Sequence, residues 1–85
     1  MKFRKKPAVI DGVQWLGLNI DEIVEFAGDA LCQGNGEYKL GINTLDSTAF
    51  AEVGDWIVKG VKGEFYPCKP DIFADTYEPV ENARP

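Results

Sequence analysis

Hydrophobic residues recur with a helical period in one short stretch of the chain. An apolar stripe at positions i, i+3, i+4 and i+7 is formed by Ile20, Ile23, Val24 and Ala27. Asn19 precedes the stripe as an expected N-cap, with Glu22 as its capping-box partner, and Gly28 is typical of a helix end. The pattern predicts a helix over residues 20–27. Such a short helix must pack against a sheet to be stable.

The rest of the chain alternates short apolar runs with turn residues, which indicates strands. We expect strands at residues 7–15, 30–33, 37–40, 42–45, 48–53, 56–59 and 64–67, with an edge strand at 77–80. The expected turns lie at 34–36, 46–47, 54–55 and 60–63, and Gly54, Asp55, Gly60 and Gly63 are their structural residues. Asp55 is expected to bond the backbone two residues further on. Pro70 can begin a helical turn over residues 70–74.

Closely spaced strands and turns are typical of an antiparallel meander. The sequence therefore predicts an α+β fold in which a small, curled, mostly antiparallel sheet of about five or six strands packs on one short helix. The helical turn near the C-terminus would close one end. With 85 residues in all, we expect a single domain over residues 1–80 and a frayed tail over 81–85.

Charge is distributed unevenly along the chain. The net charge is −5, from 14 acidic and 9 basic residues. Four of the basic residues are Lys2, Arg4, Lys5 and Lys6, so the chain beyond them is strongly acidic. An acidic body repels phosphates, which disfavours nucleic acid as a partner. The basic start is either a solvated arm, which we favour, or a contact for an anion.

Compartment and cysteine chemistry follow from two further patterns. The basic start is not followed by a long apolar run, and no apolar run could span a membrane, so we expect a cytoplasmic protein with no membrane association. Cys32 and Cys68 are then expected to be buried thiols rather than a disulfide. An alternative is that Cys68 is a nucleophile whose thiol pKa is lowered by Lys69.

The sequence contains no pattern that favours an enzyme. There is no histidine, which excludes imidazole chemistry, and no dinucleotide, calcium or nucleophile-elbow motif. Two cysteines without histidine cannot complete a structural zinc site, so we expect no metal and no cofactor. Gly60-Val61-Lys62-Gly63 matches a GxxG loop, but it lies between two strands and indicates a hairpin. Asp21 and Glu25 fit a solvated helix face.

Aromatic residues are numerous for so short a chain, with five Phe, three Tyr and two Trp. Phe65 and Tyr66 are neighbours on one strand, so they point to opposite faces, and we expect Phe65 to face the core. An exposed aromatic ring close to lysines is a plausible contact surface. The candidate ligand or partner contacts are Trp15, Lys62, Tyr66 and Lys69.

The chain also resembles a group of small phage and prophage proteins of unknown function. The matching residues are Arg4-Lys5-Lys6-Pro7 with Val9, Gln14, Trp15 and Phe26, then Val53-Gly54-Asp55-Trp56-Ile57-Val58-Lys59-Gly60, Gly63-Glu64-Phe65-Tyr66-Pro67-Cys68, Phe73 and Tyr77-Glu78. The second half is also similar to small proteins that carry a Pro-Gly-Asp-Tyr-Gly motif, although Val53 stands in place of the proline and Trp56-Ile57 in place of Tyr-Gly. The resemblance implies a phage or prophage origin and a bacterial host cell. It implies no catalytic residue.

Three functions remain open on the sequence. The first is a non-enzymatic phage accessory protein that binds a host protein, for example to inhibit a host defence or housekeeping complex. The second is the binding of a small, nucleotide-like ligand by Lys62, Tyr66 and Lys69, with Trp15 stacking on it. The third is a structural or oligomerising phage component. Independently of these functions, the sheet edges and the mixed surface of aromatics suggest self-association as a homodimer.

Overall fold

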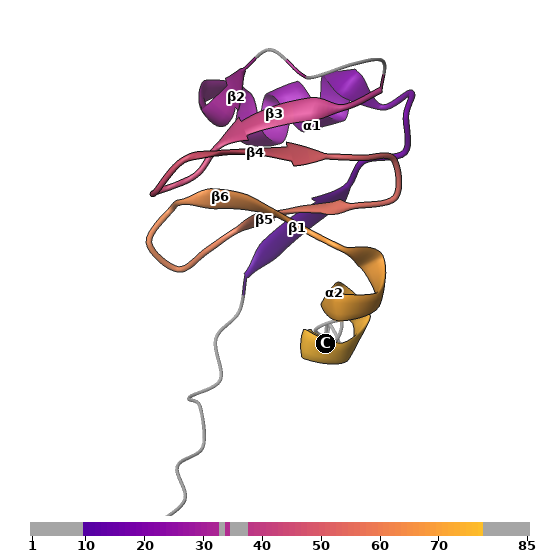
Figure 1. Cartoon of the computed structure of the whole chain (residues 1–85), viewed down its shortest axis with the longest axis vertical. Helices are drawn as coiled ribbons and strands as arrows, with labels where there is room; N and C mark the ends of the chain where they lie inside the picture. The colour runs from indigo at the N-terminus through magenta and orange to yellow at the C-terminus, as the bar shows by residue number, and fades with distance from the viewer. Residues whose placement is uncertain (1–9, 33, 35–37, 78–85) are drawn as a thin grey trace, which may run out of the picture.

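Six strands form two separate antiparallel sheets in the computed structural model, which describes residues 10–32, 34 and 38–77 (Figure 1). The first sheet has the order β1-β5-β6, with β1 at Asp11–Gln14, β5 at Trp56–Lys59 and β6 at Phe65–Cys68. The second has the order β2-β3-β4, with β2 at Leu31–Cys32, β3 at Leu40–Asn43 and β4 at Thr48–Ala51. The α+β class and the antiparallel pairing are confirmed.

The expectation of one curled sheet is wrong, and the turn between β4 and β5 explains why. After this turn β5 pairs with β1, with Gly12 opposite Val58, and does not continue the hairpin with β4. Two backbone hydrogen bonds fix this change of partner: Trp15 N–H donates to the Asp55 carbonyl at 2.9 Å, and Gly54 N–H donates to the Trp15 carbonyl at 2.7 Å. The meander is therefore divided in two at Gly54.

Helix α1 occupies Ile20–Ala27, the residues that the apolar stripe predicts, and it buries Ile23 and Ala27. Asn19 is the N-cap residue and Gly28 follows the last residue of α1, as predicted, but the capping interactions differ from expectation. The Asn19 side chain makes no capping bond; its Oδ1 accepts a bond from Leu16 N–H, and its Nδ2 donates to Glu22 Oε1. Gly28 does not end the helical path, because it keeps a right-handed helical conformation and begins the 3₁₀ helix η1 at Gly28–Ala30.

Several strand boundaries also differ from expectation. The predicted strands 37–40 and 42–45 are one strand, β3, because the backbone continues through the buried Gly41, which pairs with both Cys32 and Phe50. Strand β4 ends at Ala51 rather than at residue 53. The predicted edge strand begins at Tyr77, which directly follows a helix, and residues 78–80 lie outside the described residues. So do residues 1–9, most of the 34–36 turn and the tail 81–85.

The core lies where α1 meets both sheets. Its buried residues are Trp15, Ile23, Ala27, Ile42, Ala51 and Ile57. Phe65 packs against this cluster from β6, and its ring meets that of Phe26 edge to face at a centroid distance of 5.4 Å. Phe65 therefore faces the core, as its position on the strand predicts.

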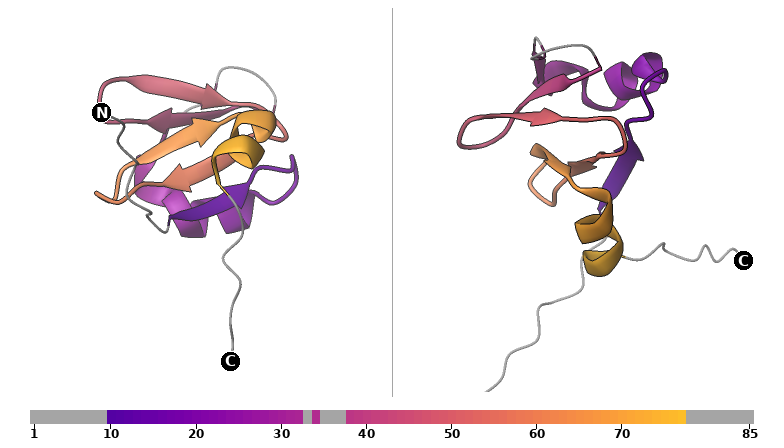
Figure 2. Two further views of the ribbon diagram at one scale, coloured as in Figure 1. Left: turned by 90° about the horizontal axis from the view of Figure 1, so that it is seen from below. Right: turned by 45° about the vertical axis from the view of Figure 1, so that its right-hand side comes forward.

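The C-terminal helix α2, at Pro70–Thr76, is attached to the first sheet by aromatic rings. Pro70 stands at its first turn, as predicted. The Phe73 ring stacks on Trp56 of β5 at 4.2 Å and 3°, and Tyr77 packs against Phe73 at 5.1 Å. The two helices lie at opposite ends of the molecule, with α1 at the top and α2 at the bottom of Figure 1 and of the right-hand view in Figure 2. Within the described residues, neither helix is long and apolar enough to cross a membrane.

Candidate interaction site

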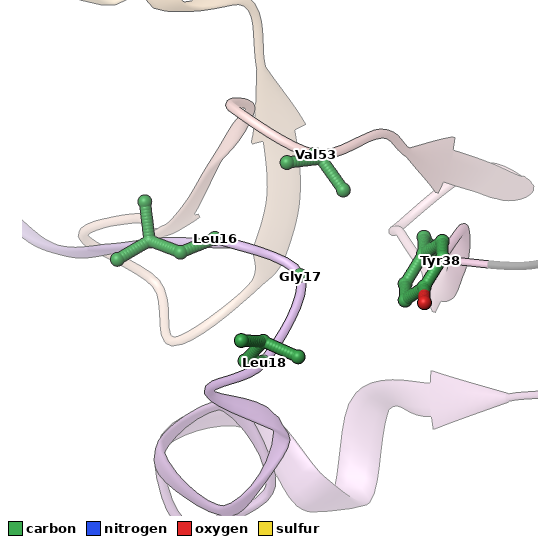
Figure 3. A pocket seen from close by; sticks show the side chains of 5 residues that line it. All are labelled: Leu16, Gly17, Leu18, Tyr38 and Val53. Carbon is green, nitrogen blue, oxygen red and sulfur yellow. The ribbon is translucent and has the colours of Figure 1, made fainter.

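Four exposed apolar side chains gather around a shallow hollow of about 280 Å³ (Figure 3). We name this surface the apolar patch; it consists of Leu16, Leu18, Tyr38 and Val53, arranged around Gly17. Leu16 and Leu18 come from the loop between β1 and α1, Tyr38 precedes β3, and Val53 lies in the turn between β4 and β5. Leu18 is the most exposed large apolar side chain among the described residues, at 89%. Three segments distant in sequence thus build one surface.

The β1–α1 loop presents its two leucines because its backbone is held from both sides. Gly17 has a φ of +94°, a conformation that glycine adopts without steric cost, and a Cβ there would lie 3.4 Å from a methyl group of Val53. Asn19 accepts a hydrogen bond from Leu16 N–H at 2.8 Å and donates one to the Gln14 carbonyl at 2.9 Å. The Asn19 side chain therefore holds the loop backbone in place, and Leu16 and Leu18, on either side of Gly17, remain at the surface.

Tyr38 is held in an unusual backbone conformation at the far side of the hollow. Its φ is +62°, in the left-handed region that costs a residue with a Cβ about 1–2 kcal/mol. The Trp15 indole N–H donates a 2.7 Å hydrogen bond to the Tyr38 carbonyl, and Trp15 itself is only 4% exposed. A buried core residue thus fixes the backbone of an exposed patch residue. The sequence pattern predicts Tyr38 within a strand, and this expectation is wrong.

Val53 is positioned by the tight turn that contains Asp55. Asp55 is 3% exposed, and its Oδ2 accepts hydrogen bonds from Glu52 N–H at 2.9 Å and from Lys69 Nζ at 3.1 Å. The carboxylate thus bonds backwards to Glu52 and not to a residue further on. Gly54 has a φ of +101°, and no heavy atom lies within 4 Å of the position that a Cβ would take.

Gly60 and Gly63 lie in the predicted turn over residues 60–63, in which Gly63 N–H donates a hydrogen bond to the Gly60 carbonyl at 3.0 Å.

Ion pairs link the residues next to Val53 and Tyr38 in the sequence. Glu52 lies 3.6 Å from Lys39 and 3.7 Å from Lys69, and Lys69 also pairs with Asp55. The hydrogen bond to Asp55 raises the pKa of the Lys69 ammonium, and the charges of Asp55 and Glu52 raise it further. Both lysines beside the patch are therefore paired with carboxylates.

The structure does not bring the four sequence-predicted contact residues into one hollow. Trp15 is buried in the core, and Lys62 lies in the exposed turn before β6. Tyr66 lies on β6, and its hydroxyl is hydrogen-bonded to that of Tyr77 at 3.0 Å. Burial and this bond raise the pKa of the Tyr66 hydroxyl. Lys69 follows β6, so the length of this strand separates it from Lys62.

The cysteines differ from expectation. Cys32 is exposed at the end of the two-residue strand β2, so the prediction of a buried thiol is wrong there. Cys68 is partly buried, and this burial raises the pKa of its thiol, with further contributions from the charges of Asp55 and Asp71. The alternative in which Lys69 lowers this pKa is wrong, because the pKa is raised and the Lys69 ammonium is paired with Asp55 and Glu52.

A second hollow, of about 300 Å³, lies beside the end of α1. It is lined by Val24, Glu25, Phe26, Ala27, Gly28, Asp29, Lys59 and Phe65. Its charged groups are of both signs, and the Lys59 ammonium lies 5.8 Å from the centre of the Phe65 ring. Unlike the apolar patch, this hollow has charged side chains in its lining.

The apolar patch is identified from the geometry of the structure and not from similarity to a known protein. No known protein family, curated protein or solved structure was found to match this chain. Over residues 10–32, 34 and 38–77, no three acidic or cysteine side chains are grouped so that they could hold a metal ion. The sequence pattern does not reveal the patch, because its members show no common periodicity and meet only through the fold.

Proposed function

We propose that this protein is a non-enzymatic binding protein that contacts a partner protein through the apolar patch. The observation that carries the proposal is the exposure of Leu16, Leu18, Tyr38 and Val53 around one hollow. Scattered apolar residues are normal at a surface, but a contiguous group mounted on fixed backbone is typical of an interaction site. Burying one aliphatic or aromatic partner side chain in the hollow would contribute about 1.5–3 kcal/mol.

The size and lining of the hollow support a protein partner over a small ligand. Its volume of about 280 Å³ is at the lower limit of the range of about 300–1,000 Å³ that is usual for small-molecule sites. Tyr38 supplies the hydroxyl that is the one polar side-chain group in the lining. A nucleotide-like ligand also needs free cations, whereas Lys39 and Lys69 beside the patch are paired with carboxylates. The hollow suits a single inserted side chain.

The absence of histidine and the raised thiol pKa of Cys68 support a non-enzymatic role. Without histidine, the chain has no imidazole group for acid–base catalysis. The one cysteine considered as a nucleophile, Cys68, has a thiol pKa that burial raises, which reduces the fraction of reactive thiolate. The resemblance to small phage and prophage proteins supports a host protein as the partner, inside the bacterial cell, with inhibition of a host defence or housekeeping complex as the concrete form of the activity.

A second candidate is a structural or self-associating phage component. The same exposed patch favours it, because a homodimer with two-fold symmetry would bury the patch against its copy. In that case the hollow of each copy would receive Leu18, the most exposed patch residue, from the other.

Site-specific photo-crosslinking tests both candidates. A benzophenone amino acid is placed at Leu18 and, as a matched control, at Leu45, which is 72% exposed in the loop between β3 and β4 and outside the patch. In host cells we expect a discrete host protein to be crosslinked from position 18 only, and Val53→Asp to abolish the product. A product with the mass of two copies would support self-association. Equal labelling from both positions, or none from position 18, would contradict binding at the patch.

A further inference from the structure

The apolar patch continues directly into an acidic helix face. Helix α1 begins two residues after Leu18, and its exposed acidic residues are Asp21, Glu22 and Glu25, followed by Asp29 in η1. No basic residue occurs between residues 20 and 30. Ile20 and Val24 on the same helix are also exposed. An apolar ridge and an acidic ridge therefore run side by side away from the hollow.

Within the described residues, the acidic charge of α1 and η1 is offset at one end by Lys59, which lines the second hollow together with Glu25 and Asp29. The described residues include eleven acidic and four basic side chains. Of the four lysines, Lys39 and Lys69 are paired with Glu52 and Asp55, on the Val53 side of the patch. Lys59 lies over the Phe65 ring, and Lys62 lies in the β5–β6 turn. Among the described residues, the charged side chains that follow Leu18 most closely along the chain, Asp21 and Glu22, are both acidic, and a partner with complementary charge is cationic there.

We propose that the patch recognises a cationic polypeptide segment of the partner, which inserts one apolar side chain into the hollow and places lysine or arginine along α1. This inference rests on the proposed function and names the chemistry of its partner. Asp21 and Glu25 are four residues apart on a helix, a rise of about 6 Å. Alternate side chains of an extended segment are spaced by about 6.6 Å. Two basic residues at alternate positions would therefore face these two carboxylates.

The negative charge of the α1 face also disfavours nucleic acids, anionic membranes and acidic protein segments as binding partners at the patch. A nucleic acid or an anionic membrane would bring phosphates against Asp21 and Glu25, and this contact is repulsive. An acidic protein segment would be rejected for the same reason. Because exposed charges are screened by salt, binding of a cationic segment is expected to weaken as ionic strength rises.

Selection from a displayed library of random peptides tests the inference before the partner has been identified. The wild-type protein is immobilised, and the enriched peptides are sequenced. We expect them to combine a large apolar residue with lysine or arginine at alternate positions, and to lose binding to Leu18→Asp. A synthetic peptide of the enriched sequence should lose about tenfold in affinity, about 1.4 kcal/mol, against the double variant Asp21→Lys/Glu25→Lys.

The chain offers a matched control for this double variant. Asp71 and Asp75 are also exposed and four residues apart, but on α2, at the opposite end of the molecule from α1. The variant Asp71→Lys/Asp75→Lys makes the same change in net charge and should leave the affinity unchanged. An equal loss in both double variants would show a general charge effect and would overturn the inference.

The possible outcomes separate the two proposals. Enriched peptides that need Leu18 but are neutral or acidic would overturn the cationic partner and leave the patch as a binding site. Enriched basic peptides that bind Leu18→Asp equally well would show binding away from the patch and would count against both proposals. A selection that enriches no peptide against the wild-type protein would also count against both.

Discussion

The indole N–H of Trp15 donates a 2.7 Å hydrogen bond to the carbonyl oxygen of Tyr38, which joins the core to the apolar patch. The bond holds Tyr38 at a φ of +62°, where a residue with a Cβ is strained. Residues with strained backbone are concentrated at binding and active sites. If the patch binds a partner as proposed, one substitution at Tyr38 is expected to change stability and binding in opposite directions.

Replacing Tyr38 by glycine tests that opposition. Tyr38→Gly removes the steric cost of the left-handed backbone, and we expect it to raise the free energy of unfolding by up to about 1 kcal/mol. It also removes a patch side chain, so crosslinking from position 18 should weaken. Urea unfolding gives the first quantity. A clear loss of stability would show that the Tyr38 ring itself contributes to the fold.

We expect the buried carboxylate of Asp55 to contribute strongly to the free energy of unfolding, although the residue lies in a turn. Asp55→Ala removes the acceptor for Glu52 N–H and for the Lys69 ammonium, and we expect it to cost about 2–3 kcal/mol in urea unfolding. Asp55→Asn keeps an acceptor for Glu52 and should cost less. Lys69→Met should have the smallest effect, because Lys69 is more than half exposed. The opposite order among the three variants would show that the ion pair dominates over the backbone bond.

The pH dependence of stability should reveal the environment of Tyr66. Burial and the bond with Tyr77 raise the pKa of its hydroxyl above the usual value of about 10. Below that pH both folded and unfolded states keep the phenol neutral, so its contribution to stability is complete. Above it only the unfolded state ionises, so stability falls as pH rises towards the folded-state pKa. Tyr66→Phe should make this alkaline fall shallower in unfolding curves measured at successive pH values; an unchanged slope would refute the assignment.

The aromatic stack should control the attachment of α2. None of the α2 residues is fully buried, so the stack of Phe73 on Trp56 is its main anchor. Phe73→Ala is expected to detach the helix and cost about 2–3 kcal/mol, part of it from the stacking geometry. Exposure of Trp56 should shift tryptophan emission to longer wavelength. Ile72→Ala removes an exposed neighbour on the same helix and should change neither quantity; an equal shift from it would point away from the stack.

Local patterns in the sequence predict the local elements well. Helix α1 spans the residues of its apolar stripe, and β5 spans the most β-prone run, because in both cases a few adjacent side chains decide the conformation. The pairing of β5 with β1 is not local, and it depends on the backbone bonds between Trp15 and the Gly54-Asp55 turn. Alternation alone favours pairing with the preceding strand, so it predicts a single sheet.

The residues of the candidate site are harder to predict from the sequence than the elements of the fold. Trp15 and Tyr66 are candidates on the sequence because they are aromatic, yet both use their polar groups within the protein, on Tyr38 and Tyr77. Leu18 and Val53 have aliphatic side chains that do not mark them as site residues in the sequence, and only their exposure in the structure identifies them. The left-handed conformation of Tyr38 likewise depends on a residue that is distant in sequence.

The division into two sheets also sets an order in which the chain can acquire structure. Strands β2, β3 and β4 are contiguous in sequence, so their pairing requires only short loops to close. Strand β1 must wait for β5, which emerges from the ribosome only after the entire second sheet and α1. Because long-range pairing slows folding, the registration of β1 against β5 is expected to be the late step. The backbone bonds of Trp15 to the Gly54-Asp55 turn depend on that step, so a nascent chain would expose Leu16 and Leu18 before the hollow around them is complete.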